Sequence, residues 1–166
     1  AFSPCGTTLA AASSDHTVTL WNISDRFGAQ SPFDSKIERL ITKFKGHQSW
    51  TSDVKYSNDG KTIISAGDNS LRFWDCSPDQ RLIRSLEAHK NRVCSIACNP
   101  DGVSFASAND HFIKIWDIES GRLLHRLESH QKGTRWLVYS PDGKTLTSMS
   151  GDRTAVKLWD TQTGNL

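Results

Sequence analysis

Histidine, serine and aspartate recur together in this chain, and these residue types can act as a general base, a nucleophile and an orienting carboxylate. The first set is His47, Ser65 and Asp68. A serine hydrolase needs one such trio, with an oxyanion hole beside the nucleophile. Two further sets follow at similar spacing: His89, Ser107 and Asp110, and His130, Ser148 and Asp152. Because the trio repeats, we expect a structural role for it, with no catalytic residue, no cofactor and no metal site.

Each set is followed by a tryptophan in a short recurring phrase. The phrases are LWN around Trp21, FWD around Trp74, IWD around Trp116 and LWD around Trp159. Successive tryptophans lie 53, 42 and 43 residues apart. A period near 42 indicates a repeat architecture.

The elements that must position these residues are short strands. Asp-Gly turns at Asp59-Gly60, Asp101-Gly102 and Asp142-Gly143 each separate two stretches of alternating apolar residues. A third strand ends at the tryptophan, and LIRSLE or LLHRLE supplies a fourth. We therefore expect an all-β chain of four-stranded antiparallel meanders. One such sheet cannot bury both faces, so the copies should stack radially.

Each of the last three repeats contains, in order, a small residue with histidine, an Asp-Gly turn, an aspartate and Trp-Asp. This pattern resembles that of the WD-repeat family, whose fold is a β-propeller with one four-stranded sheet per blade. The resemblance covers essentially the whole chain, with repeats at about 1–45, 46–87, 88–128 and 129–166. It implies that the histidine, serine, aspartate and tryptophan of each blade form a buried hydrogen-bonded tetrad. The tetrads are His47, Ser65, Asp68 and Trp74; His89, Ser107, Asp110 and Trp116; and His130, Ser148, Asp152 and Trp159. The first repeat departs from this pattern, with Ala11 at the serine position and Asn22 after the tryptophan.

The first and last repeats are incomplete in this alignment. Residue 1 falls near the end of a first strand, and residue 166 lies where the fourth strand of the last blade should begin. We expect a partial ring that belongs to a larger propeller of seven or eight blades, in the same chain or completed by a second copy. Unpaired strand edges and uncovered apolar flanks should prevent residues 1–166 from forming a stable isolated monomer.

The same resemblance places the loop before each first strand on the top face of the propeller, around its channel. Trp50 lies in such a loop, and Arg92 has the equivalent place in the next repeat. Tryptophan and arginine dominate the energetics of protein interfaces. The candidate partner-binding residues on this rim are Gln48, Trp50, Lys90, Arg92, Gln131, Ser14 and Asn109. For Trp136, which precedes the apolar Leu137, we favour a position in the core.

The extra length of the first repeat falls between Asp25 and Ile37. Its glycine, proline and polar residues predict an extended loop between the third and fourth strands. A docking role and a solvated insertion without a partner are both compatible with it, and Phe27 and Phe33 favour docking slightly.

Composition excludes several classes of function. The net charge of +2 comes from interspersed basic and acidic residues, so we expect no nucleic acid partner. No apolar stretch approaches 18 residues, so we expect no membrane association. The spacing of Cys94 and Cys98 fits neither a zinc site nor a redox pair, which favours reduced thiols in the cytoplasm or nucleus.

The leading prediction is a non-catalytic scaffold that presents propeller loops to partner proteins or peptides. The alternative is a regulatory or sensor segment of a larger signalling ATPase or another multidomain protein. A GxxxxGK[ST] motif upstream in the full-length chain would favour the alternative.

Overall fold

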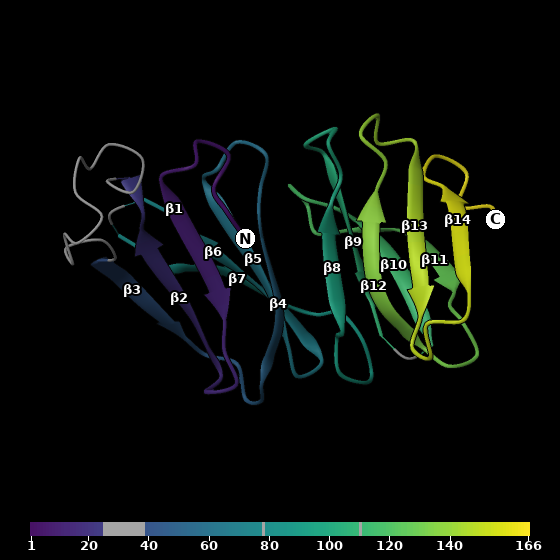
Figure 1. Ribbon diagram of the computed structural model, residues 1–166, viewed down its shortest axis with the longest axis horizontal. Helices are drawn as coiled ribbons and strands as arrows, with labels where there is room; N and C mark the ends of the chain where they lie inside the picture. The colour runs from purple at the N-terminus through teal and green to yellow at the C-terminus, as the bar shows by residue number, and fades with distance from the viewer. Residues whose placement is uncertain (25–38, 78, 110) are drawn as a thin grey trace.

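The computed structural model describes residues 1–24, 39–77, 79–109 and 111–166. In these ranges the regular structure is β, and four antiparallel sheets follow one another in a row (Figure 1). The expected all-β fold of propeller blades is therefore confirmed. The loop Asp25 to Ile37 lies outside the described residues, as does Asp110. Across the described ranges, no helix has the length and apolar character that crossing a membrane requires.

The sheets, which we number as blades 1 to 4, are simple meanders in chain order. Blade 1 contains β1 (Thr8–Ala12), β2 (Thr17–Asn22) and β3 (Arg39–Lys45). Blade 2 contains β4 (Thr51–Tyr56), β5 (Thr62–Gly67), β6 (Ser70–Asp75) and β7 (Leu82–Glu87). Blade 3 contains β8 (Ser95–Cys98), β9 (Ser104–Ala108), β10 (Phe112–Asp117) and β11 (Leu123–Glu128). Blade 4 contains β12 (Thr134–Tyr139), β13 (Thr145–Ser150) and β14 (Val156–Asp160).

The Asp-Gly turns form the hairpins that the sequence predicts. Gly60, Gly102 and Gly143 all have a φ of 72°, a left-handed conformation that glycine adopts without a steric cost. In the first of these turns the Asp59 carboxylate accepts hydrogen bonds from the Ser57 hydroxyl (2.6 Å) and the Lys61 amide (3.0 Å). Each turn thereby fixes how the first strand of its blade pairs with the second.

Blade 1 also contains a short remnant of a first strand. The Ala10 amide donates to the Ala1 carbonyl (2.8 Å), and Phe2 forms an antiparallel bridge with Leu9. This pairing is the one that the repeat alignment predicts for the first residues.

Three apolar clusters fill the spaces between neighbouring blades. The cluster between blades 1 and 2 contains Val18, Phe44 and Trp74, with the rings of Phe44 and Trp74 centred 5.1 Å apart. Phe105 and Trp116 lie in the cluster between blades 2 and 3, and Trp159 lies in the one between blades 3 and 4. The tryptophans of blades 2, 3 and 4 therefore each pack against the preceding blade, and burial of this apolar surface holds the row together.

In blades 2 and 3, burial is greatest in the second strand and least in the fourth. All five residues of β9 are buried, as are five of the six in β5. The fourth strands β7 and β11 consist mainly of exposed and half-buried residues. The cores therefore lie against the second and third strands.

One face of blade 4 exposes apolar side chains. Trp136, Val138, Val156 and Leu158 are 57–61% exposed. The expectation that Trp136 lies in the core is thus wrong. Its neighbours Leu137 and Tyr139 belong to the core shared with blade 3. Because side chains alternate along a strand, Leu137 takes the inward side and Trp136 the outward one.

Candidate interaction surface

The tetrad residues of blade 2 meet in the interior. The Trp74 indole N–H donates to Ser65 Oγ (2.8 Å), and Ser65 Oγ lies 2.8 Å from His47 Nε2. Since Ser65 accepts from the indole, its own proton is free to be donated to His47 Nε2. This assignment puts the imidazole proton on Nδ1, which lies 3.5 Å from Asp68 Oδ2, beyond a normal hydrogen bond. Ser65 has no exposed surface.

Asp68 also closes the turn between β5 and β6. Its carboxylate accepts from the Gln48 amide and the Ser70 amide, both at 2.8 Å. Gly67, just before it, lets this turn pack on the histidine, because a Cβ there would lie 2.8 Å from the His47 ring. The aspartate thus ties the loop after β3 to this turn.

Blade 3 repeats the inner part of this arrangement. The Trp116 indole donates to Ser107 Oγ (2.8 Å), which lies 2.8 Å from His89 Nε2. Ser107 has no exposed surface, and His89 is 6% exposed.

Blade 4 brings three of its four expected residues together. Trp159 donates to Ser148 Oγ (2.9 Å), which lies 3.0 Å from His130 Nε2. The expected fourth member, Asp152, instead accepts from Ser150 Oγ (2.6 Å) and the Thr154 amide (3.1 Å). Asp152 follows its serine by four residues, whereas Asp68 follows its serine by three. The longer turn directs its carboxylate to the turn itself.

Burial changes the titration of the three histidines. It lowers the pKa of His89 to about 4, assisted by the charge of Lys114. Burial also lowers the pKa of His47 and His130, against the opposing effects of Asp68 and of the Ser148 hydrogen bond. The neutral imidazoles expected near pH 7 agree with the donor and acceptor roles above.

Blade 1 has a different arrangement at the equivalent place. With Ala11 at the serine position, the Trp21 indole donates to Thr19 Oγ1 (3.0 Å). Asp15 accepts from the Thr17 hydroxyl (2.6 Å) and forms an ion pair with Lys43 (2.9 Å).

The lysines two positions before Trp116 and Trp159 also join the framework, and they were not among the residues predicted from the sequence. Lys114 Nζ donates to the Ala88 carbonyl (2.5 Å) and lies 5.3 Å from the ring of Trp116. Lys157 Nζ donates to the Ser129 carbonyl (3.0 Å) and lies 5.2 Å from the ring of Trp159. Their fixed distance from the tryptophan was a signal that could have found them.

We define the top face as the loops that join one blade to the next and the turns between second and third strands. Trp50 is 56% exposed there, and the Arg92 guanidinium lies over its ring at 5.7 Å. The other rim candidates that are exposed are Gln48, Lys90, Gln131 and Ser14.

The expectation that Asn109 belongs to this rim is wrong. Asn109 is 2% exposed, and its Oδ1 accepts from the amides of His111 (3.0 Å) and Phe112 (2.8 Å). An asparagine that closes a tight turn turns its side chain toward the backbone, so this residue stabilises the turn.

A hollow of about 430 Å³ lies in this region of the top face. Its lining residues are Ser52, Arg92, Cys94, Lys132, Gly133, Thr134, Arg135, Trp136 and Gly151. Lys132 and Arg135 were not among the predicted site residues, because they lie at positions where the other repeats have different residue types.

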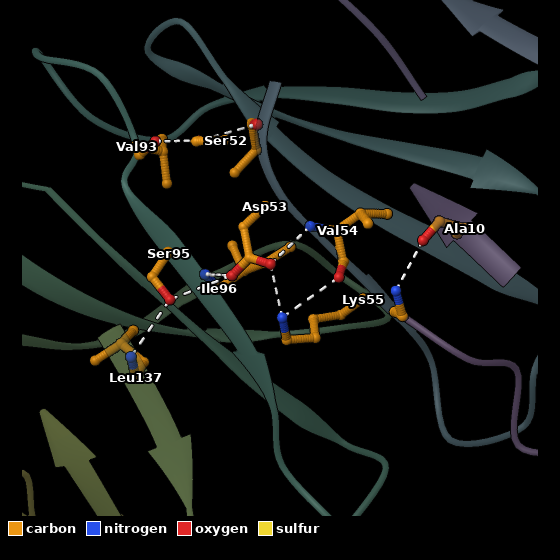
Figure 2. A network of polar contacts seen from close by, with 11 residues as sticks. Ala10, Ser52, Asp53, Val54, Lys55, Val93, Ser95, Ile96 and Leu137 are labelled. Carbon is orange, nitrogen blue, oxygen red and sulfur yellow. Dashed lines mark hydrogen bonds and ion pairs between the residues drawn. The ribbon is translucent and has the colours of Figure 1, made fainter. Parts of the chain in front are cut away.

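A polar network joins the first strands of three blades just below this face (Figure 2). Asp53 of β4 accepts from the Ile96 amide (2.9 Å) and from Ser95 Oγ (3.2 Å), both on β8. Ser95 Oγ in turn accepts from the Leu137 amide of β12 (3.3 Å). Lys55 Nζ lies 2.6 Å from the other Asp53 oxygen. These contacts hold three neighbouring blades in register beneath the loops.

In the described part of the chain, no three histidine, cysteine or acidic residues are grouped so that they could hold a metal ion. Cys5, Cys76 and Cys98 are free thiols. Burial raises the pKa of Cys98 to about 12 and that of Cys76 to about 11.

Comparison with known proteins gives one family. The family model described as "WD domain, G-beta repeat" matches residues 1–22, 38–75, 80–117 and 121–160. The nuclear distribution protein nudF of Emericella nidulans is 30% identical to this chain, over 95% of the chain and 38% of that protein. A probable cytosolic iron-sulfur protein assembly protein 1 of Malassezia globosa is 36% identical over 48% of the chain and 23% of its own length. The small ribosomal subunit protein RACK1 of Caenorhabditis elegans is 34% identical over 42% of the chain and 21% of its own length. The chain thus spans well under half the length of these relatives.

Proposed function

Because this chain belongs to the WD-repeat family, whose members typically bind other proteins, we propose that it is a non-catalytic scaffold. Its top face would present loops to partner proteins or peptides. The observation that carries this proposal is the exposed Trp50, stacked with Arg92 on a rigid framework. Exposed tryptophan and arginine side chains are the ones that most often anchor an interface.

The absence of catalysis is part of the proposal, and the burial of the serines supports it. Ser65, Ser107 and Ser148 have no exposed surface, and each hydroxyl oxygen accepts a hydrogen bond from a tryptophan indole N–H. A nucleophile must reach its substrate, and these hydroxyl groups have no open space beside them for an acyl group.

We also propose that the segment, with repeats at about 1–45, 46–87, 88–128 and 129–166, belongs to a larger propeller. The greater length of the relatives and the exposed apolar face of blade 4 support this view. A cytoplasmic or nuclear location is proposed as well, and the name of the Malassezia globosa relative supports it.

Affinity capture from cell extract tests the scaffold function. The full-length protein would be compared with its Trp50→Ala/Arg92→Ala variant, and bound proteins would be quantified by mass spectrometry. The matched control is Lys61→Ala/Lys144→Ala, which changes exposed residues in the hairpin turns at the opposite end of the blades. We expect a defined set of proteins to be lost from the Trp50 and Arg92 variant alone. Equal recovery from all three forms would count against a partner surface at this position.

A further inference from the structure

The charge of the top face narrows the kind of partner that fits it. Among its described lining residues, the hollow beside Trp50 contains Arg92, Lys132 and Arg135 and no carboxylate. All three cations are exposed. The ion pairs between described residues involve Lys43, His47 and Lys55, so no described carboxylate lies within 4 Å of these three cations.

Three carboxylates in the turns of the top face are already engaged. Asp68 accepts hydrogen bonds from two backbone amides, Asp152 accepts them from Ser150 and Thr154, and Asp15 is paired with Lys43. Hydrogen bonds from Ser150 and Thr154 lower the pKa of Asp152 to about 2, so it remains ionised and bonded within its turn. These three carboxylates are thus bonded within the protein, whereas the cations of the hollow face solvent.

The backbone holds this hollow in shape. The Gly151 amide donates to the Gly133 carbonyl (3.0 Å), and a Cβ at Gly151 would lie 2.2 Å from the Lys132 carbonyl oxygen. Only a residue without a side chain lets the turn after β13 approach the loop that carries Lys132. On the opposite wall, the Ser52 hydroxyl donates to the Val93 carbonyl (2.5 Å), next to Arg92.

The opposite end of the blades carries both signs of charge, with more acidic than basic side chains among the described residues. Carboxylates recur there in the hairpin turns and at the ends of the third strands: Asp59, Asp75, Asp101, Asp117, Asp142 and Asp160. An acidic ligand would be repelled from that end and attracted to the hollow, which gives the chain a preferred side for such a partner.

We propose that the hollow formed by Arg92, Lys132 and Arg135, with Trp50 at its edge, binds an acidic segment of a partner protein. This inference rests on the scaffold function proposed above and names the chemistry of its partner. The carboxylates of the segment pair with the three cations, while the stacked Trp50 and Arg92 contact its backbone and apolar side chains.

Binding of a fluorescein-labelled hexaglutamate peptide to the full-length protein, followed by fluorescence anisotropy, tests the proposal. We expect saturable binding that weakens as salt rises from 50 to 200 mM, because exposed charge pairs are screened. The Arg92→Ala/Lys132→Ala/Arg135→Ala variant should bind about tenfold or more weakly, the sum of three surface ion pairs of ordinary strength. The charge-matched control is Lys61→Ala/Arg122→Ala/Lys144→Ala at the opposite end, which should bind like the parent.

Two other probes separate the remaining explanations. Hexaglutamine of the same length should not bind, and a six-nucleotide oligothymidylate should bind more weakly than hexaglutamate. Tighter binding of the oligonucleotide, lost in the same variant, would overturn the proposal in favour of nucleic acid. Equal hexaglutamate binding by parent and variant would also overturn it. If that happened while the capture experiment still depended on Trp50 and Arg92, the scaffold function would stand and only the acidic chemistry of the partner would fall.

Discussion

Individual side chains in this protein meet three needs at once, and His89 illustrates them. It fills space in the loop after β7, accepts a hydrogen bond from the Ser107 hydroxyl and is linked through that serine to the Trp116 indole. We expect His89→Ala to lower the free energy of unfolding by about 1–3 kcal/mol, because buried polar groups lose their partner. Chemical denaturation measures this change.

His111 provides the control for that variant, since it lies in the same blade and is exposed. His111→Ala should change the free energy of unfolding by less than about 0.5 kcal/mol. If both substitutions had the same small effect, the tetrad of blade 3 would contribute little to stability.

The pKa of His89 gives a prediction for pH dependence. Burial lowers it from 6.5 to about 4, so the unfolded chain binds the proton more tightly than the folded chain does. The stability that the neutral imidazole contributes is therefore complete above pH 6.5 and is lost as the pH falls toward 4. Thermal unfolding across this range should show a falling midpoint. His89→Gln, which does not titrate, should reduce the slope, and an unchanged slope would assign the effect to other groups.

At the residue scale, the types and spacing of the tetrad members could be read from the sequence because they recur with the period of the fold. The sequence could not show that Asp152 accepts hydrogen bonds from Ser150 and Thr154 in its own turn, since one additional residue in a turn changes the direction of a side chain by an amount that only the backbone reveals. Asn109 was misjudged for a related reason. An asparagine in a turn can point its side chain into solvent or hydrogen-bond to the turn backbone, and both arrangements are compatible with the same sequence.

Between elements, the contacts of Asp53 join blade 2 to blade 3. Its carboxylate accepts hydrogen bonds from the Ile96 amide and the Ser95 hydroxyl of β8, and it also forms an ion pair with Lys55. Asp53→Ala should lower the free energy of unfolding by about 1–3 kcal/mol through the unpaired groups that it leaves. Asp59→Ala, in an exposed hairpin turn, is the comparison and should cost less.

A double-mutant cycle of Asp53→Ala with Ser95→Ala would separate this network from general effects of substitution. We expect a coupling of about 0.5 kcal/mol or more, since the two side chains share a hydrogen bond. Simple additivity of the two changes would contradict a shared network.

The order of strands, their hairpins and the third-strand position of each tryptophan could be predicted because local turn chemistry and a period of two determine them. The network around Asp53 could not. It joins first strands of different blades, and which residues meet across that boundary depends on the angle between sheets rather than on any local pattern. Trp136 was misplaced for a different reason, since the alternation that turns Leu137 toward the core turns the residue before it outward.

For the molecule as a whole, the exposed face of blade 4 determines how the chain should behave alone. Trp136, Val138, Val156 and Leu158 lie together there and are more than half exposed. A contiguous apolar patch favours association. We expect residues 1–166, purified alone, to sediment as dimers or larger species whose proportion rises with concentration.

The variant Val156→Thr/Leu158→Thr replaces two apolar side chains of this face with polar ones that are compatible with a strand. It should reduce that association. The control, Val103→Thr, changes an exposed apolar residue in a hairpin turn. If residues 1–166 sedimented as a monomer at every concentration, the exposed apolar face of blade 4 would not drive association.

The difference in burial between the second and fourth strands of blades 2 and 3 also sets the order in which backbone amides should exchange with deuterated solvent. Opening of a fourth strand such as β11 uncovers few apolar groups, whereas opening of β9 must break the cores on both sides of blade 3. The amides of Phe105 and Ala106 should thus become labelled last, and those of Leu123 and Leu124 among the first. Mass spectrometry of peptides from these strands would follow the two rates separately, and equal rates would mean that a blade opens only as a unit.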